Sequence, residues 1–418
     1  MRQFFVFFAF VFLASCSESP SQQSPPHFEL DMTGPEYQRH LSENPEVLND
    51  PDFKILKPIL DLGKRNLDWL IRINQGRAAG NQISLTSEAT MRGYPIDRPR
   101  EYNVRVILGW HRDLLKKMPQ AMAKVLTGSE PLPANPTLTE ADYIFWGNET
   151  DQVYQVAARW LMLKKYRQGM IDNRRNDIRG YYFLIREPEL AQRLDAWAEL
   201  SPADQAKYRE WLIGTCGNAN ELLICTRELD EIIAKKDSVR AYWEKYRPFS
   251  QDIYESNFEI QWERSDIRWT SAQPEFATIP FVDPKNEKIA TYLKENVEAE
   301  WKWGAWQLLV QFQNGSKSNM SHIEFEPNVT AHVKVPNTIV MDENQPTTEY
   351  DSRWTIRHEF GHILGFPDCY IEFYDVDREL MISYQIDITN LMCSRRGKLK
   401  QTHFDEMKRV YLDALEKH

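Results

Sequence analysis

Residues 357–370, RHEFGHILGFPDCY, contain two histidines, a glycine and an aspartate at spacings that restrict how the chain can fold. His358 and His362 are four residues apart, so on a helix they lie on one face within reach of a single ion. Gly365 can adopt a positive φ at little cost, which lets the chain leave the helix there and turn back. The spacing therefore predicts a helix up to Gly365 and a metal site made of His358, His362 and Asp368.

This set of side chains fits zinc. Imidazole nitrogens and carboxylate oxygens are common zinc ligands, and three protein ligands leave a fourth position open. Glu359 follows the first histidine, which on a helix rotates it by about 100° around the axis, outside the ligand set but beside the metal. That position suits a general base for metal-bound water. The alternative is an ordinary helix whose histidines are hydrogen-bonded core residues. A His-Glu-x-x-His string arises by chance in roughly one or two of a hundred such chains, which favours the metal site.

The length and composition of the chain indicate a globular protein with more than one domain. Its 418 residues are enough for two or three domains, and 42% apolar and 12% aromatic residues are enough to form buried cores. The formal net charge is −10. This charge argues against nucleic acid as a partner, because binding to phosphates needs a basic surface.

The N-terminal residues resemble the signal of a bacterial lipoprotein. The apolar run FFVFFAFVFLA is too short to span a bilayer but has the length of a secretory-signal core. The ending Leu-Ala-Ser-Cys is similar to a lipobox, which implies lipidation of Cys16 and attachment to a membrane. We expect residues 1–16 to be the signal peptide and residues 17–35, rich in serine and proline, to be a flexible tether. By analogy with known sorting rules, Ser17 favours the outer membrane of the bacterial cell envelope. An ordinary secretory signal with a chance cysteine is the alternative.

Five cysteines divide into one for the lipid and four that an oxidising envelope allows to form two disulfides. The close pairs are Cys216 with Cys225 and Cys369 with Cys393. Four cysteines allow three pairings, so the sequence alone leaves the connectivity open. We predict that Cys369 and Cys393 are joined, which would brace the loop of the proposed ligand Asp368. Two buried free thiols are the alternative.

Residues 36–248 have a helical pattern. Few β-branched runs occur here, and apolar residues recur at helical spacing. Thr139, with Asp142 three residues later, and Ser201 are expected to cap two of the helices. The pattern predicts a helical domain of unknown role with a boundary near Pro248.

Residues 249–418 have a mixed pattern. FEIQWERSDIRW and EFATIPFV alternate as strands do, and HIEFEPNVTAHVKV and NTIVMD return to strand spacing. Residues 286–312 are expected to form one long helix. The helix of the histidines is expected to begin near Ser352, and a last helix is expected to be capped by Thr402 with Asp405. The whole chain is therefore predicted to be α+β, with a mainly helical domain followed by a domain built on a mixed sheet.

The string HEFGHILGFPD resembles the extended zinc signature of the metzincin metallopeptidases, in the variant where aspartate replaces the third histidine, as in the snapalysin type. In element order the resemblance covers roughly residues 250–418. It implies a zincin-like catalytic domain with a twisted mixed sheet, an active-site helix and a C-terminal helix. It also implies that His358, His362 and Asp368 bind Zn²⁺ and that Glu359 acts as general base and acid.

Metzincins also carry a methionine in a tight turn beneath the metal. DITNLMCSRRG resembles this Met-turn, which would make Met392 the methionine. Met381 in RELMISYQI is the rival, but it sits in an apolar, strand-like stretch. The strand AHVKVPNTIVMDE occupies the place of the metzincin edge strand, which binds extended peptide by adding it to the sheet. An ordinary buried strand is the alternative there. Tyr370 or Tyr384 could help to stabilise an oxyanion, and the sequence does not choose between them.

Together these features predict a zinc-dependent endopeptidase that acts on protein or peptide substrates and is anchored through Cys16. A second hypothesis is a zinc-stabilised binding or scaffold lipoprotein of the envelope with little or no hydrolysis. The presence of Glu359 argues against it, because a structural site needs ligands but no base. A third is latency, with the helical domain over the cleft and Cys216 bound to zinc as a thiolate. The nearby Cys225 favours a plain disulfide instead.

Overall fold

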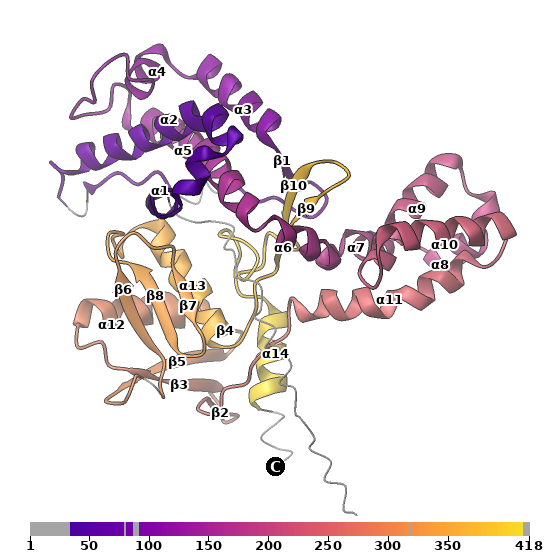
Figure 1. Cartoon of the computed structure of the whole chain (residues 1–418). Coiled ribbons are helices and arrows are strands. Elements are labelled where there is room, and N and C mark those ends of the chain that lie inside the picture. Colours follow the sequence, from indigo (N-terminus) through magenta and orange to yellow (C-terminus); the bar gives the residue numbers. More distant parts are fainter. Residues whose placement is uncertain (1–33, 79–80, 87–91, 318, 413–418) are drawn as a thin grey trace, which may run out of the picture. The chain divides into compact units, whose positions relative to one another are not determined.

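The computed structural model describes residues 34–78, 81–86, 92–317 and 319–412. By their contacts these residues belong to one compact unit. The predicted signal peptide with Cys16, and nearly all of the predicted tether, lie outside the described residues. Helices and several small sheets combine in an α+β fold, which confirms the predicted class at this level (Figure 1). Among the described helices, none is both long enough and apolar enough to cross a membrane.

The first half of the described chain is almost entirely helical. Its α-helices are α1 (Gly34–Glu43), α2 (Pro51–Asn74), α3 (Val104–Lys117), α4 (Gln120–Leu126), α5 (Glu140–Lys165), α6 (Arg167–Asp172), α7 (Arg179–Leu184), α8 (Leu190–Asp195), α9 (Pro202–Gly217), α10 (Leu222–Lys235) and α11 (Val239–Ser256). Short 3₁₀ turns are η1 (Pro45–Asn49), η3 (Asn173–Asn176) and η4 (Trp197–Glu199). Both predicted caps are confirmed, since the Thr139 and Ser201 hydroxyls accept from the backbone N–H groups of Asp142 and Asp204.

Two clusters of buried side chains among the described residues lie between these helices. One lies between α2, α3, α4 and α5, where Trp69 meets Tyr143 edge to face at a centroid distance of 5.0 Å. The other lies between α7, α9, α10 and α11. It contains the disulfide between Cys216 and Cys225, which confirms that predicted pair.

The predicted boundary at residue 248 is displaced, and the helical region is not separate from the sheets. Helix α11 continues through Pro248 to Ser256, so the helices end eight residues later than predicted (256 − 248). Strand β1 (Arg100–Tyr102) lies within the helical region, yet it pairs with β10 (Leu380–Gln385) near the C-terminus. A single strand between helices has no signal in local periodicity, because its partner lies far away in the sequence.

The main sheet is built from residues after 256. Its strands are β2 (Arg268–Thr270), β3 (Phe276–Val282), β4 (Lys302–Trp303), β5 (Trp306–Gln313), β6 (His322–Glu326), β7 (His332–Lys334) and β8 (Thr338–Asp342). They pair in the orders β2-β3-β5-β4 and β6-β8-β7, and a bridge between Phe281 and Ser321 joins the two groups. The β3–β5 and β6–β8 pairs are parallel, whereas β7 runs antiparallel to β8 at the edge.

A smaller sheet follows the helix of the histidines. It consists of the hairpin β9 (Tyr370–Asp375) and β10, with β1 on the outer side of β10. Figure 1 shows this hairpin beside β1 and α6. The pairing of β1 with β10 therefore joins the hairpin that follows the histidine helix to the helical region.

One predicted helix is wrong over its second half. Helix α12 (Glu287–Leu293) continues as one π-turn, η5 (Lys294–Glu298), and the chain then forms the β4–β5 hairpin. Gly304, with φ of 59°, makes the turn between these strands. Leu308 and Val310 in β5 alternate into the core, so the apolar run fits a buried strand as well as it fits a helix. The strand expected over residues 258–269 is reduced to β2, because most of that segment forms turns.

The two last helices are where the sequence places them. Helix α13 (Tyr350–Ile363) carries the histidines, and its residues Ile356 and Phe360 pack with Phe281 of β3 in the main core. Helix α14 (Gln401–Tyr411) begins two residues earlier than a helix capped by Thr402 would, and Thr402 is not its cap. Instead His403 Nδ1 accepts a hydrogen bond from the backbone N–H of Lys400.

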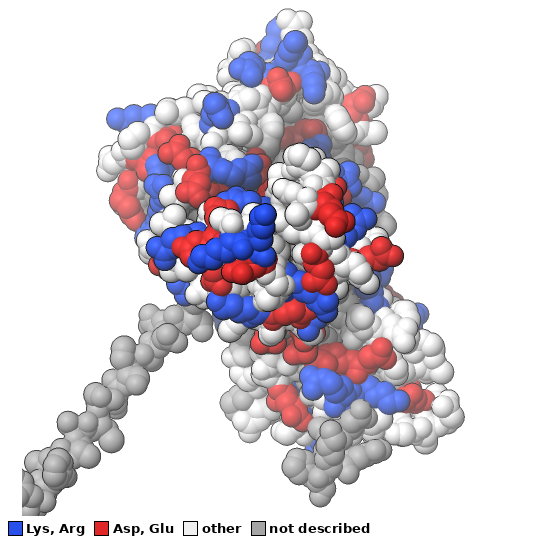
Figure 2. All heavy atoms as spheres, turned by 90° about the vertical axis from the view of Figure 1, so that its right-hand side faces the viewer, with Lys and Arg blue, Asp and Glu red and all other residues white. Residues whose placement is uncertain are grey.

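Charged side chains cover the surface without separating by sign. On the face drawn in Figure 2, Lys and Arg are interspersed with Asp and Glu. Ion pairs between neighbouring helices, such as Arg209 with Asp230 at 2.8 Å, are exposed at both ends. Pairs of this kind contribute little to stability because water screens them.

Candidate metal centre

Three predicted ligand atoms converge at the C-terminal end of α13. His358 Nε2 lies 3.1 Å from His362 Nε2 and 3.1 Å from Asp368 Oδ1, and His362 Nε2 lies 3.5 Å from the same oxygen. Among the described residues these three form the only such group of His, Cys, Asp or Glu side chains. Their side chains are between 7% and 14% exposed, so the site is sheltered yet reachable from solvent.

The other ring nitrogens of the two histidines face backbone carbonyls. His358 Nδ1 is 3.0 Å from the Leu391 oxygen, and His362 Nδ1 is 2.8 Å from the Phe366 oxygen. A carbonyl only accepts, so each Nδ1 carries a proton and donates it, and in the neutral ring this leaves Nε2 with a lone pair. Two lone pairs and a carboxylate oxygen thus point at one another. This arrangement is repulsive without a cation and favourable with one.

The distances also fit the size of zinc. Zinc bonds of about 2.0–2.1 Å to nitrogen and oxygen imply about 3.3 Å between neighbouring ligand atoms of a tetrahedron. The three observed separations, 3.1, 3.1 and 3.5 Å, bracket that value. The residues present can therefore hold a tetrahedral ion through three ligands, with the fourth position left open.

The electrostatic field at the centre is negative. Burial lowers the pKa of the His362 imidazole, but the nearby Asp368 carboxylate and then that of Glu359 raise it, from 6.5 to about 9. The carboxylates of Asp368 and Glu359 favour a proton on this imidazole, and for the same electrostatic reason they favour a metal ion in place of that proton.

The chain reaches Asp368 through the predicted break at Gly365. This glycine has φ of 90°, and a Cβ on it would lie 2.3 Å from the backbone oxygen of Trp262. The Phe366 N–H donates to the oxygen of Gly361, which closes the end of the helix. Only glycine meets both requirements, so the return of the chain toward the histidines depends on this residue.

Glu359 lies beside the three ligands but outside their set. Its side chain is buried, and Oε2 has no hydrogen-bond partner among the described residues. Its charge contributes to the raised pKa of the His362 imidazole, after the larger effects of burial and of Asp368. A buried carboxylate oxygen without a partner costs free energy, which is typical of a group kept for chemistry.

Met392 lies directly against α13, whereas Met381 does not. A Cβ on Gly361, between the two histidines, would lie 2.3 Å from Met392 Sδ. The backbone oxygen of Met392 accepts from the N–H of Cys369, and that of Leu391 accepts from His358. Met381 is buried in β10, where its register partner is Tyr374.

A disulfide joins the loop of the third ligand to the turn of Met392. Cys369 and Cys393 are bonded, which confirms the second predicted pair. Because Cys216 is bonded to Cys225, the hypothesis of a Cys216 thiolate on the metal is wrong.

Some residues around the centre have no clear signal in the sequence. Trp354, one turn before His358, stacks on its ring at a centroid distance of 4.8 Å. Asn390 accepts from the N–H of Met392, and its Oδ1 lies 3.0 Å from His403 Nε2. Burial lowers the pKa of His403 to about 4, so this ring is neutral. Of these residues, only Trp354 could have been noted from the sequence, because it lies four residues before His358 and therefore on the same face of the helix.

The two tyrosines considered as oxyanion donors differ in their positions. Tyr384 is buried, its hydroxyl donates to Asp177 at 2.9 Å, and it accepts from the backbone N–H of Ile178. It is therefore engaged with the helical region. Tyr370 begins β9, two residues after Asp368.

Comparison with family models, with curated proteins and with solved structures finds no match to this chain.

Proposed function

We propose that the protein is a zinc-dependent endopeptidase of metzincin type. The observation that carries the proposal is the convergence of His358, His362 and Asp368, next to a buried Glu359 whose Oε2 has no hydrogen-bond partner within the described part of the chain. The placement of Met392 beneath Gly361 adds support, because the sequence resembles a Met-turn at that position.

In this proposal each residue has a separate task. His358, His362 and Asp368 hold the ion, and the carbonyls of Leu391 and Phe366 fix the two rings in the required tautomer. Zinc, when bound, supplies a Lewis acid that lowers the pKa of a water molecule and polarises a carbonyl group. Glu359 accepts the proton of the attacking water and then donates it to the leaving amine.

The edge of the main sheet offers a place for the substrate. Strand β7 is the antiparallel edge strand of its group, and the next residue, Val335, is exposed. An unpaired edge can accept an extended peptide through main-chain hydrogen bonds. Such pairing reads the backbone more than the side chains, which suits a peptidase of broad specificity.

The alternative of a zinc-stabilised scaffold explains fewer of these features. A structural ion would need the three ligands but gains nothing from Glu359, whose buried Oε2 has no hydrogen-bond partner among the described residues, which is destabilising. We also propose attachment to the bacterial envelope through Cys16, on the basis of the lipobox-like sequence alone.

Metal analysis and digestion of a casein-type substrate test the function. Zinc-loaded protein starting at Ser17 should contain one zinc per chain and cleave the substrate. Glu359→Gln should keep the zinc and lose cleavage, whereas Glu343→Gln, at an exposed position, should leave both unchanged. Zinc without cleavage in the unsubstituted protein would favour the scaffold, and cleavage by Glu359→Gln would reject the assigned base.

A further inference from the structure

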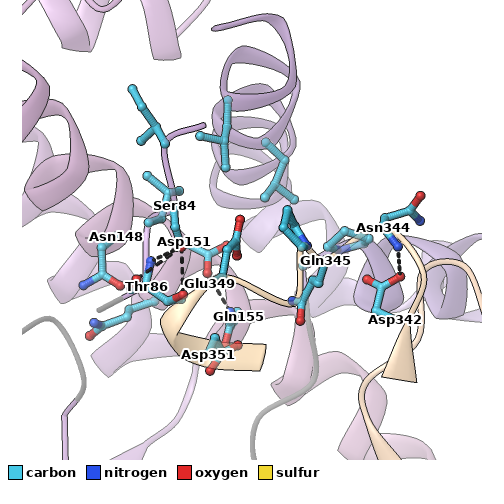
Figure 3. Close-up of a pocket in the computed structure, with 18 of the residues that line it drawn as sticks. Ser84, Thr86, Asn148, Asp151, Gln155, Asp342, Asn344, Gln345, Glu349 and Asp351 are labelled. Carbon is cyan, nitrogen blue, oxygen red and sulfur yellow. Dashed lines mark hydrogen bonds between the residues drawn. The ribbon is translucent and has the colours of Figure 1, made fainter. Parts of the chain in front are cut away.

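A large cavity lies beside the metal centre, between the helical region and the start of α13. Its volume is about 690 Å³, which is within the usual range for ligand sites. Residues of α2, α5, the segment 82–86 and the loop from β8 to α13 line it. Figure 3 shows polar side chains from these elements facing one another across it.

The cavity and the metal centre share one face of α13. Asp351 lines the cavity and precedes His358 by seven residues, or two helical turns, so both side chains leave the helix on the same side. Two turns span about 10.5 Å, the length of about three residues of extended peptide. Trp354 lies between them against His358, and Arg395, three residues after Met392, lines the cavity next to Asp351.

Among the described residues, four carboxylates line the cavity, and two of them, Asp151 and Glu349, form no ion pair, although the Arg395 charge acts on Asp151 and partly offsets the effect of its burial on the pKa. Asp351 pairs with Arg395 at 2.5 Å, and Asp342 Oδ1 accepts from two backbone N–H groups. Asp151 Oδ2 accepts from the Gln155 amide, but its Oδ1 is shielded from solvent and has no hydrogen-bond partner among the described residues. Glu349 interacts with the Ser84 hydroxyl.

The other basic groups of the lining are directed elsewhere. Arg92 forms an ion pair with Glu149, which does not line the cavity. The Arg100 guanidinium lies over the rings of Tyr94 and Tyr102, and its Nε donates to Ser383. Asp151 and Glu349 therefore leave an excess of negative charge facing the cavity.

This arrangement raises the pKa of both the Asp151 and the Glu349 carboxyl groups. Burial raises the pKa of Asp151 to about 6, and burial together with the charge of Asp351 raises the pKa of Glu349 to about 7. Two half-buried carboxylates that each feel the charge of Asp351 would be stabilised by a positive charge in the cavity.

We propose that this cavity binds a lysine or arginine side chain of the peptide substrate, about three residues from the bond that is cleaved, through Asp151 and Glu349. The inference rests on the proposed peptidase function. Amide side chains of α2, α5 and the β8–α13 loop offer donors and acceptors for the peptide backbone, and apolar side chains of α2 and of the segment 82–86 line much of the rest. The site is thus a mixed cavity, with an apolar wall that suits the methylene stem of such a side chain and carboxylates that suit its charged end.

Binding can be measured without cleavage. Zinc-loaded Glu359→Gln would be titrated with fluorescent octapeptides, each of which carries one lysine at a different position, and with matched peptides that carry norleucine instead. For at least one position we expect the lysine peptide to bind ten- to a hundredfold more tightly. Adding Asp151→Asn and Glu349→Gln should abolish this difference, whereas adding Glu343→Gln, an exposed acid outside the lining, should preserve it.

Two results would overturn the inference. One is equal binding of lysine and norleucine peptides at every position, and the other is a lysine preference that survives both cavity substitutions. These substitutions remove buried charge, so they should not hinder folding, and circular dichroism checks this. Failure of the peptidase function would appear separately, as zinc-loaded protein with Glu359 intact that leaves all these peptides uncut. Binding to the acidic cavity would still be measured in that case.

Discussion

Arg159 of α5 and Glu372 of β9 form an ion pair in the interior, with side chains 2% and 6% exposed. Arg159 Nε lies 3.0 Å from both carboxylate oxygens, and the Tyr102 hydroxyl donates to one of them. Glu372 is four residues beyond Asp368. The pair therefore fastens the helical region to the strand that leaves the metal centre, which argues that this region is a permanent part of the fold.

Replacing Glu372 by glutamine should lower the free energy of unfolding by about 3–5 kcal/mol, because it leaves the Arg159 charge buried and uncompensated. Urea unfolding followed by circular dichroism measures the change. Arg209→Gln is the matched control, since it breaks an ion pair with Asp230 that is 38% and 51% exposed. The control should cost less than about 1 kcal/mol. A loss of that small size in Glu372→Gln would contradict the assigned role.

Gly365→Ala should destabilise the protein and weaken zinc binding together. The substitution adds a Cβ where φ is 90° and where the Trp262 oxygen would be only 2.3 Å away. The chain must then shift, and Asp368 moves with it.

Gly128→Ala is a control that separates the cost of the positive φ from the cost of the steric clash. Gly128 has φ of 85°, but a Cβ there meets nothing within 4 Å, so this variant carries only the backbone strain of about 1–2 kcal/mol. Unfolding curves and competition with a zinc chelator compare the two variants. Equal losses in both, with zinc affinity unchanged, would show that the helix end tolerates the new atom.

The disulfide between Cys369 and Cys393 should slow the release of zinc. It closes a loop with a sequence separation of 24 and joins the residue after Asp368 to the residue after Met392. Replacing both cysteines by serine should cost about 3.5 kcal/mol in the chain-entropy model and speed the loss of zinc to a chelator.

The second disulfide provides the control for that measurement. Cys216→Ser with Cys225→Ser removes a disulfide of separation 9, at a cost of about 2.7 kcal/mol in the same model. It lies in the core of α9 and α10, so the rate of zinc release should stay the same. If both double variants released zinc equally fast, the effect would be general loosening rather than support of Asp368.

The ligands could be predicted because they are local. His358, His362 and Asp368 lie within eleven residues, and helical periodicity with one glycine break is enough to bring them together. Met392 needed more than periodicity, since only its resemblance to a Met-turn placed it near the metal. The structure then adds what no local pattern contains, such as the carbonyl of Leu391 that fixes the tautomer of His358.

The features that could not be predicted from the sequence depend on residues that are far apart along the chain. The run after Gly304 forms β5 because β3 is present to pair with it, and the same apolar run would also suit a buried helix. The pairs Arg159–Glu372 and β1–β10 join residues more than 200 positions apart. The cavity likewise depends on Asp151 and Glu349 meeting across two regions, which no periodicity records.

Membrane attachment should depend on Cys16. Lipidated protein should partition with membranes, whereas Cys16→Ser should be recovered in the soluble fraction, because a polar serine cannot carry the acyl chains that hold a lipoprotein in the bilayer. Mass spectrometry of the mature N-terminus tests the modification directly. An unmodified Cys16 in membrane-bound protein would reject the lipobox prediction.

The acidic cavity should make the protein less stable as the pH rises. Asp151 and Glu349 have folded-state pKa values of about 6 and about 7, above the ordinary values of 3.8 and 4.5. Between the ordinary and the raised values the folded protein binds more protons than the unfolded chain, so the free energy of unfolding falls with increasing pH. The decline should begin near pH 4 and level off above pH 7.

Asp151→Asn with Glu349→Gln should remove this decline. At pH 4 the double variant and the unsubstituted protein should have similar stability, because both carboxyls are protonated in the folded protein and only partly ionised in the unfolded chain. At pH 8 the variant should be more stable by about 2–3 kcal/mol, after allowance for partial exposure of both side chains. Urea unfolding at pH 4, 6 and 8 measures the difference, with Glu343→Gln as the control that should show none. Equal stability at pH 8 would mean that the two carboxylates are not strained, and the electrostatic reason for a cationic ligand in the cavity would be lost.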